Sequence, residues 1–188
     1  MSNIGNLPDR LFLCGFMGTG KSTIGAALAR RLECPFADLD TIIEEETGQS
    51  IPEIFEHQGE EKFRTLEKKC LLQTVRTFKG VLALGGGALH NQHVVDHLKV
   101  NGLLIFVETS FSVILNRILK HEDRPLLLDK DGTMKEKSIL EKELKELYEQ
   151  RLPYYRQAEI TIETGTGAGI EATTEKLVKK IRNHVAYH

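Results

Sequence analysis

The stretch "GFMGTGKST" at residues 15–23 decides which fold the sequence indicates. Gly15, Gly20, Lys21 and Ser22 match the pattern G-x-x-x-x-G-K-[ST] of a P-loop. The motif requires a strand before it and a helix after it, and the apolar residues 11–14 precede this copy, while an amphipathic helix is predicted over 20–32. A glycine-rich turn without a ligand is the alternative, but it leaves the lysine and the serine unexplained.

The residue types of this stretch suit a polyphosphate. Glycines permit backbone torsions that aim successive N–H groups inward, and a helix N-terminus adds positive potential. Lys21 is expected to reach the β- and γ-phosphates of a nucleoside triphosphate, and the Ser22 hydroxyl to ligate Mg²⁺. The expected nucleotide-binding residues of the loop are Gly18, Thr19, Gly20, Lys21, Ser22 and Thr23.

Composition and charge indicate one globular domain rather than several. The chain has 188 residues and a formal charge of −2, which argues against nucleic acid as its main partner. Three widely spaced cysteines form no CxxC pair, so we expect a reducing compartment, the cytoplasm. No apolar run approaches the roughly 18–20 residues of a membrane span. His90, His93 and His97 are interpreted as a solvated helix face rather than a metal site.

Short apolar runs alternate with helical patterns along the chain, which is typical of a parallel sheet covered by helices. We therefore predict an α/β three-layer sandwich with a five-stranded parallel sheet. The strands are predicted at 10–14, 35–38, 81–84, 103–107 and 159–163, and a second helix at about 60–78. Residues 121–134 form a connection long enough to be a lid or a binding loop.

Polar residues and glycines follow several of these strands, where open α/β sheets bind ligands. Asp38 and Asp40 close the second strand, and alternation is expected to point both carboxylates to one side; a helix N-cap is the alternative role for either. The turn "GGGA" at 85–88 permits a ligand to approach the main chain, or is only a tight turn. Three arginines suit bidentate binding of carboxylate or phosphate, although a lone arginine is ordinarily solvated: Arg64, Arg124 and Arg151.

From about residue 10 to 182, these segments together resemble the shikimate kinases, within the nucleoside monophosphate kinase-like group of P-loop proteins. The resemblance is carried by "GFMGTGKSTIG", "FADLD", "IPEIFEHQGEEKFRTLE", "LALGGGA", "DRPLL" and "RLPYY". It implies a kinase domain with the strand order 2-3-1-4-5. It also implies ATP-dependent phosphorylation of the 3-hydroxyl of shikimate, in the pathway to chorismate and aromatic amino acids.

On the nucleotide side, the resemblance implies that Lys21 and the loop amides hold the phosphates of ATP. Ser22 would hold Mg²⁺ directly, and Asp38 would hold it through water. Arg124 would close over ATP with the lid, and Arg117 would lie against the adenine.

On the acceptor side, the resemblance places shikimate in a region of about residues 39–70. Asp40 would hold the hydroxyl and act as base, while Arg64 and Arg151 would clamp the carboxylate. The three glycines of the turn would lie against the ring: Gly85, Gly86 and Gly87. Residues 1–188 are then expected to form a single kinase domain and a monomer, with small molecules as its partners and neither nucleic acid nor a membrane.

Other assignments remain open at this point. Residues 164–169, "TGTGAG", lack the Arg and Pro that some members of the family use against the base, which leaves the nucleotide selectivity open. A gluconate or nucleotide kinase of the same superfamily is the closest rival. A binding module that has lost turnover is a further alternative, although the chemical residues are all present.

Overall fold

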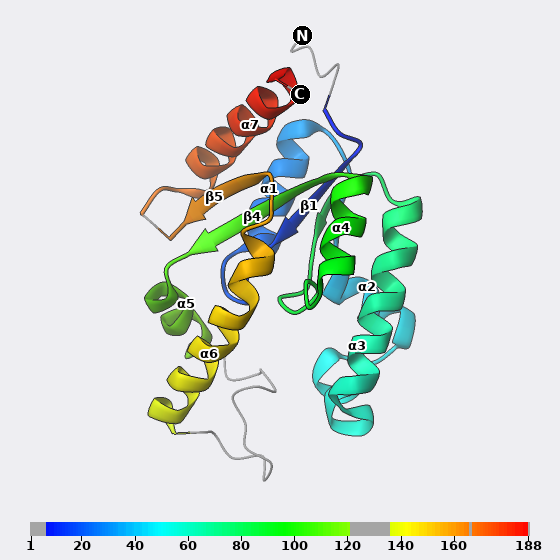
Figure 1. The fold of residues 1–188 in the computed structure, drawn as a ribbon, viewed down its shortest axis with the longest axis vertical. Coiled ribbons are helices and arrows are strands. Elements are labelled where there is room, and N and C mark those ends of the chain that lie inside the picture. The colour runs from blue at the N-terminus through cyan, green and yellow to red at the C-terminus, as the bar shows by residue number, and fades with distance from the viewer. Residues whose placement is uncertain (1–6, 121–135, 166, 188) are drawn as a thin grey trace.

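The computed structural model describes residues 7–120, 136–165 and 167–187. Its centre is a five-stranded sheet in which all strands run parallel, in the order β2-β3-β1-β4-β5 (Figure 1). The predicted fold class and the strand order implied by the resemblance are both confirmed. The strands are β1 (Arg10–Cys14), β2 (Phe36–Asp38), β3 (Gly80–Ala83), β4 (Leu103–Thr109) and β5 (Ile160–Thr164).

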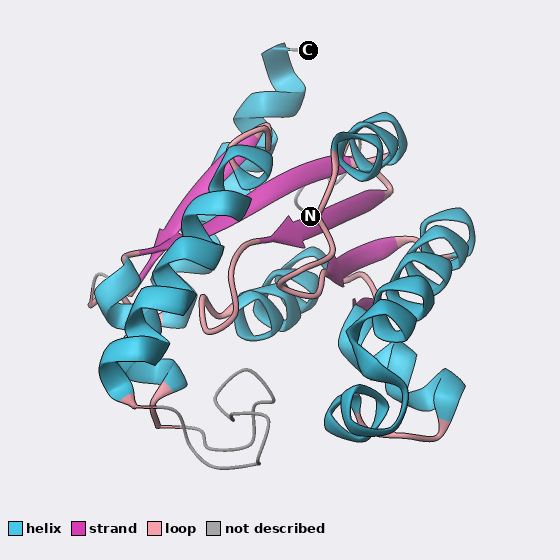
Figure 2. Ribbon diagram, turned by 60° about the horizontal axis from the view of Figure 1, so that its bottom comes forward, coloured by secondary structure: helices cyan, strands magenta, loops and turns pink. Residues whose placement is uncertain are grey.

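Helices cover both faces of the sheet and complete the three layers (Figure 2). Helices α1 and α7 pack on one face, and the other helices pack on the opposite face. The helices are α1 (Lys21–Leu32), α2 (Leu39–Thr47), α3 (Ile51–Thr77), α4 (Gln92–Asn101), α5 (Phe111–Ile118), α6 (Lys137–Tyr155) and α7 (Ile170–Tyr187).

The central strand shows why apolar runs without alternation were the correct strand signal. Leu11 and Leu13 join the core under α1 and α7, whereas Phe12 and Cys14 join the core on the other face. All four side chains are at most 2% exposed. A strand buried on both faces is apolar at every position, and this burial also fixes the direction in which the P-loop leaves the sheet.

Helix α3 is longer than the helix predicted at 60–78. It begins at Ile51, after a capping box in which the Ser50 and Glu53 side chains each accept from the other's backbone N–H. Gly59 interrupts the helix with φ 77° and ψ 170°, so the predicted segment corresponds to the part beyond a kink. The expected acceptor region at 39–70 thus consists of α2 and most of α3.

The second strand ends at Asp38, where the prediction of 35–38 places its end, so Asp40 lies beyond the strand. Asp38 is the last residue of β2 and the N-cap of α2, while Asp40 lies in the first turn of that helix. The expectation that strand alternation aligns both carboxylates is therefore wrong. Their relation comes from the cap instead, because Asp38 Oδ1 accepts a hydrogen bond from the backbone N of Asp40 at 3.0 Å.

Parallel strands place their carboxyl ends at one edge of the sheet, and the expected functional segments follow these ends. The P-loop follows β1, α2 follows β2 and the glycine turn follows β3. The expected lid at 121–134 and its Arg124 lie outside the described residues.

Candidate active site

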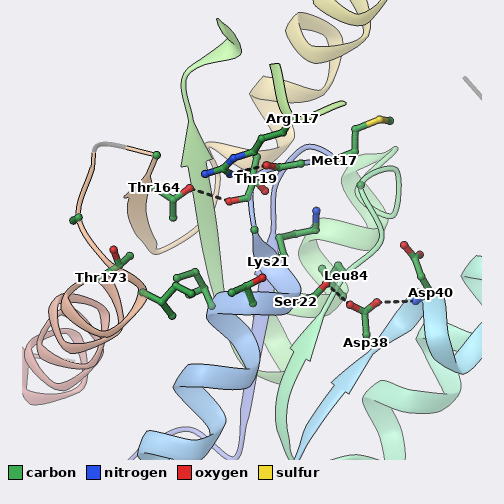
Figure 3. Close-up of a pocket in the computed structure, with 18 residues that line it drawn as sticks. Met17, Thr19, Lys21, Ser22, Asp38, Asp40, Leu84, Arg117, Thr164 and Thr173 are labelled. Carbon is green, nitrogen blue, oxygen red and sulfur yellow. Dashed lines mark hydrogen bonds between the residues drawn. The ribbon is translucent and has the colours of Figure 1, made fainter. Parts of the chain in front are cut away.

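A cavity of about 460 Å³ opens at the carboxyl edge of the sheet (Figure 3). The P-loop and the start of α1 form one wall, and segments at the ends of β2, β3 and β5 form the others. This one cavity is lined by most of the expected nucleotide and metal residues, together with Asp40 and Gly86 of the expected acceptor site. They are Gly18, Thr19, Gly20, Lys21, Ser22, Thr23, Asp38, Asp40, Gly86 and Arg117.

The P-loop is held by contacts within itself. The Thr19 hydroxyl donates to the carbonyl oxygen of Phe16 at 2.8 Å, and Lys21 Nζ donates to the same oxygen at 3.0 Å. Gly20 is the N-cap of α1, with φ 92° and ψ 23°. Lys21 is only 9% exposed, so its ammonium lies inside a loop whose following helix presents its N-terminus to the cavity. An anion is the ligand that this arrangement favours.

Two oxygen groups meet beside the loop. The Ser22 hydroxyl donates to Asp38 Oδ2 at 2.5 Å (Figure 3). A hydroxyl and a carboxylate are hard donors that suit Mg²⁺, an ion that keeps several waters and takes its remaining ligands from phosphates. Among the described residues no three His, Cys, Asp or Glu side chains form a metal cluster, so water or phosphate would have to supply the other ligands. The donor set therefore fits Mg²⁺ bound together with a nucleotide.

Asp40 has the most perturbed carboxylate of the site. Burial raises the pKa of Asp40 to about 6, and the charge of the neighbouring Asp38 adds to this effect, whereas Lys21 opposes it. A carboxylate with such a pKa is mostly ionised near neutral pH and still basic enough to accept a proton. Asp40 can therefore serve as a base at the wall of the cavity.

Arg64 and a buried glutamate approach the glycine turn from α3. Arg64 Nη1 donates to Glu67 Oε2 at 2.7 Å, and a Cβ at Gly87 would collide with the Arg64 guanidinium. Glu67 is 2% exposed, and its Oε1 finds no hydrogen-bond partner in the described parts of the chain. A Cβ at Gly85 would lie 2.7 Å from that Oε1 and 2.8 Å from Asp40 Oδ1, so both carboxylates converge on the turn.

Arg151 approaches the same turn from α6. Its Nη1 donates to the carbonyl oxygen of Gly86 at 3.0 Å, and the hydroxyl of Tyr155 donates to the same oxygen at 2.5 Å. Burial lowers the pKa of Arg151, and the positive charge of Arg64 lowers it further. Two guanidinium groups that repel each other across a short turn form a site that favours a carboxylate.

The structure thus brings the expected residues together in two adjoining groups. The first surrounds the P-loop, and the second surrounds the glycine turn: Arg64, Gly85, Gly86, Gly87 and Arg151. Asp40 belongs to both, because it lines the cavity and faces Gly85. Arg117 joins the first group by donating from Nη1 to the carbonyl oxygen of Gly18 at 2.8 Å.

Several residues that line the cavity were not predicted from the sequence, Thr164 and Thr173 among them, and neither were two beside the glycine turn: Glu67 and Tyr155. The last two had a signal in their spacing, since Glu67 lies three residues after Arg64 on α3 and Tyr155 lies four after Arg151 on α6. Side chains at these spacings share a helix face. Arg64 and Arg151 therefore each have a partner on their own helix.

A P-loop at the edge of a parallel sheet, with a basic carboxylate and two arginines beside it, defines a P-loop kinase that acts on a small acceptor. Residues 17–182 match the family model described as shikimate kinase. The chain belongs to the shikimate kinase family.

Relatives and solved structures agree with this family over nearly the whole chain. A shikimate kinase of Chlorobium phaeobacteroides is 38% identical over 175 residues, with 93% of this chain and 92% of the relative covered. One from Caldanaerobacter subterraneus is 40% identical over 169 residues, covering 90% and 94%. The structure of the shikimate kinase from Acinetobacter baumannii in complex with shikimate superposes with a TM-score of 0.83 at 36% identity, covering 94% of each chain.

A more distant neighbour shows the fold alone. The gluconokinase from Sinorhizobium meliloti has a TM-score of 0.57 at 14% identity, covering 97% of this chain and 96% of its own. Within the described residues, every helix is too short or too polar to cross a membrane.

The pKa of Asp40 can be measured directly in the free protein. We expect carboxyl ¹³C NMR in metal-free buffer to show Asp40 titrating near pH 6 rather than near its ordinary value of 3.8. Because the charge of Glu67 also raises this pKa, Glu67→Gln should lower the midpoint. The Asp40→Asn spectrum assigns the signal. A midpoint near 4 in the wild type would contradict the burial of this carboxylate.

Proposed function

We propose that this chain transfers the γ-phosphate of ATP to the 3-hydroxyl of shikimate, giving shikimate 3-phosphate and ADP. The observation that carries the proposal is the double position of Asp40. Its carboxylate lines the P-loop cavity together with Lys21 and Ser22, and it also faces the turn on which Arg64 and Arg151 converge. An acceptor held by the two arginines would thus lie beside both the base and the phosphates.

The acceptor side supports a hydroxylated carboxylic acid. The two guanidinium groups would bind the carboxylate of shikimate, since one donates within the turn at Gly86 and the other lies against Gly87. Glu67 balances the charge of Arg64 from a buried position. Glycine at 85 and 87 lets Asp40, Glu67 and Arg64 approach the main chain of the turn, because a Cβ at either position would collide with these side chains.

The transfer needs one proton acceptor and a polarised phosphate. Asp40 would take the proton of the 3-hydroxyl as that oxygen forms its bond to the γ-phosphorus, and the bond from the γ-phosphorus to the bridging oxygen breaks as ADP leaves. Lys21 and the loop amides would neutralise the charge on the phosphates. Holding both reactants side by side at Asp40 would supply much of the rate enhancement, as it does in such reactions.

Mg²⁺ would be held by Ser22 directly and by Asp38 through water, and when bound it supplies charge neutralisation at the phosphate oxygens. The 2.5 Å contact between these two side chains supports this assignment. Arg117, between the P-loop and the end of β5, would lie at the adenine end of ATP. Arg124 and the expected lid at 121–134 remain part of the proposal on the basis of the sequence alone.

The wider assignments are also proposals. We place the enzyme on the route to chorismate and aromatic amino acids, in the cytoplasm, as a monomeric single-domain kinase without nucleic acid or a membrane as partner. The net charge of −2 is compatible with these assignments.

A coupled ADP-release assay with Mg-ATP tests the proposed function. We expect release to rise with shikimate and not with gluconate or a nucleoside monophosphate, and ³¹P NMR of the product should show a phosphate ester at the 3-oxygen. If ADP release rose only with gluconate, or only with a nucleoside monophosphate, that compound and not shikimate would be the acceptor.

Removal of the base should separate chemistry from nucleotide binding. Asp40→Asn keeps the size of the side chain but cannot accept the proton, so kcat should fall by on the order of 10²–10⁴. Calorimetry with Mg-ADP should show affinity within about twofold of the wild type, because Asp40 is assigned to the acceptor. A variant with wild-type kcat would exclude Asp40 as the base.

Arg64→Lys tests the carboxylate clamp while the positive charge beside Glu67 is retained. A lysine cannot bind a carboxylate bidentately, so KM for shikimate should rise roughly tenfold or more, with little change in KM for ATP. Arg76→Lys is the matched control, since Arg76 is exposed on the same helix. Equal losses for both substrates in Arg64→Lys would show that the clamp is misassigned.

A further inference from the structure

Two threonines connect the P-loop to the far strands of the sheet. Thr109 ends β4 and Thr164 ends β5, and their Cα atoms are register partners in the parallel ladder. Their hydroxyl oxygens are 2.5 Å apart. Thr164 Oγ1 donates to the carbonyl oxygen of Thr19 at 2.9 Å (Figure 3). The last row of the β4–β5 ladder therefore carries a polar contact to the phosphate-binding loop.

The two hydroxyls also make longer contacts: Thr109 Oγ1 lies 3.4 Å from the carbonyl oxygen of Thr19, and Thr164 Oγ1 lies 3.4 Å from that of Glu108. Each hydroxyl has a single proton, and the 2.9 Å contact assigns that of Thr164 to the Thr19 carbonyl. The arrangement with the shorter contact to the carbonyl, 2.9 Å against 3.4 Å, has Thr109 donating to Thr164 across their 2.5 Å separation. The two hydroxyls act in series, and a hydrogen bond of this kind is strengthened by the one behind it. Thr109 is 2% exposed, so water does not compete for its hydroxyl.

The carbonyl that these hydroxyls hold belongs to the peptide between Thr19 and Gly20. A trans peptide is planar, so its C=O and N–H point to opposite sides. When the Thr19 carbonyl is directed toward β5, the Gly20 N–H is directed away from β5. Gly20 has φ 92° and ψ 23°, a left-handed conformation that glycine adopts without steric cost, so glycine alone does little to stop this peptide from rotating.

We propose that Thr109 and Thr164, the threonine clamp, lock the Thr19–Gly20 peptide in the orientation that presents its N–H to the nucleotide phosphates. This inference rests on the proposed function, because it requires a nucleotide in the P-loop. The clamp residues are positioning residues, since they act through the Thr19 carbonyl. A neighbouring contact, from Arg117 to the carbonyl of Gly18, holds the preceding peptide from α5.

The clamp also connects the P-loop to Thr164 and Gly165, where the chain leaves β5. Gly165 has φ +80°, and a Cβ there would lie 3.2 Å from Thr109 Cγ2 and 3.7 Å from Arg117 Nη2. Thr164 and Gly165 both line the cavity at this end. Thr109 does not line the cavity, so a substitution of Thr109 can affect ligand binding through the clamp but not by direct contact with the ligand.

Mg-ADP titration calorimetry on four single variants tests the clamp. Thr164→Val and Thr109→Val keep the shape but lose the hydroxyl. Thr164→Val should weaken ADP binding by roughly tenfold, and Thr109→Val by roughly threefold, because Thr164 can still donate to the Thr19 carbonyl in that variant. Thr164→Ser should restore affinity to within about twofold of the wild type. Thr161→Val is the matched control on β5, because the Thr161 hydroxyl makes no hydrogen bond within the described residues, and it should bind as the wild type does.

Two further readouts separate positioning from general stability. The double variant of Thr109 and Thr164 should bind ADP no more weakly than Thr164→Val alone, because the hydroxyls act in series. In steady-state assays the valine variants should raise KM for ATP while KM for shikimate stays within about twofold of the wild type. Thermal unfolding of each variant shows whether it is folded, and the serine variant keeps the test decisive if a valine variant is not.

The outcomes distinguish the clamp from the proposed function. Wild-type ADP affinity in Thr109→Val would overturn the clamp, and a loss confined to Thr164→Val would assign Thr164 a direct contact with the nucleotide instead. A wild-type protein that binds Mg-ADP but does not phosphorylate shikimate would overturn the proposed function, while the ADP titrations would still decide the clamp. A wild-type protein that binds no ADP would overturn both.

Discussion

The Asp38 carboxylate accepts hydrogen bonds from two elements that carry different parts of the chemistry. One oxygen accepts from the Ser22 hydroxyl on α1, and the other accepts from the backbone N of Asp40 on α2. Since α1 begins in the P-loop and α2 carries the candidate base, this single side chain sets the distance between the phosphate site and the acceptor site. Its own position follows from β2, which ends at Asp38 beside β3 in the parallel sheet.

The site contains several buried charged side chains, and burial of a charge costs folding free energy. Lys21 and Glu67 are both buried, and Arg64 is held by Glu67. Buried charges of this kind destabilise a fold unless they are paired, and Glu67 Oε1 has no partner in the described parts of the chain. The raised pKa of Asp40 has the same origin, because burial and neighbouring carboxylates disfavour its charge. This strain is what makes Asp40 a useful base.

The sequence was sufficient for most of the fold because its signals were local. Short apolar runs located all five strands to within about two residues, and the P-loop pattern located the start of α1. The N-cap of α2 was harder to predict from the sequence, because "ADLD" fits both an alternating strand and a helix that is capped by Asp. The part of α3 before Gly59 was also missed, because the apolar positions that predicted the helix begin only at Phe63.

The candidate site was predictable where residue type alone carries the chemistry, as at Lys21 and Ser22. The pairing of Arg64 with Glu67 required knowledge of which helix face is buried, and the contact of Thr164 with Thr19 joins residues 145 apart in the chain. Spacing cannot reveal such contacts, because they depend on how β4 and β5 are aligned in the sheet. The roles assigned to these residues remain predictions.

A crystal structure of this protein with Mg-ADP and shikimate would test the central claim, that one cavity edge holds both reactants around Asp40. The account predicts the shikimate carboxylate between Arg64 and Arg151, the 3-hydroxyl on Asp40, and that hydroxyl facing the β-phosphate of ADP in the P-loop. A carboxylate bound away from the two arginines, or a 3-hydroxyl directed away from Asp40, would contradict it.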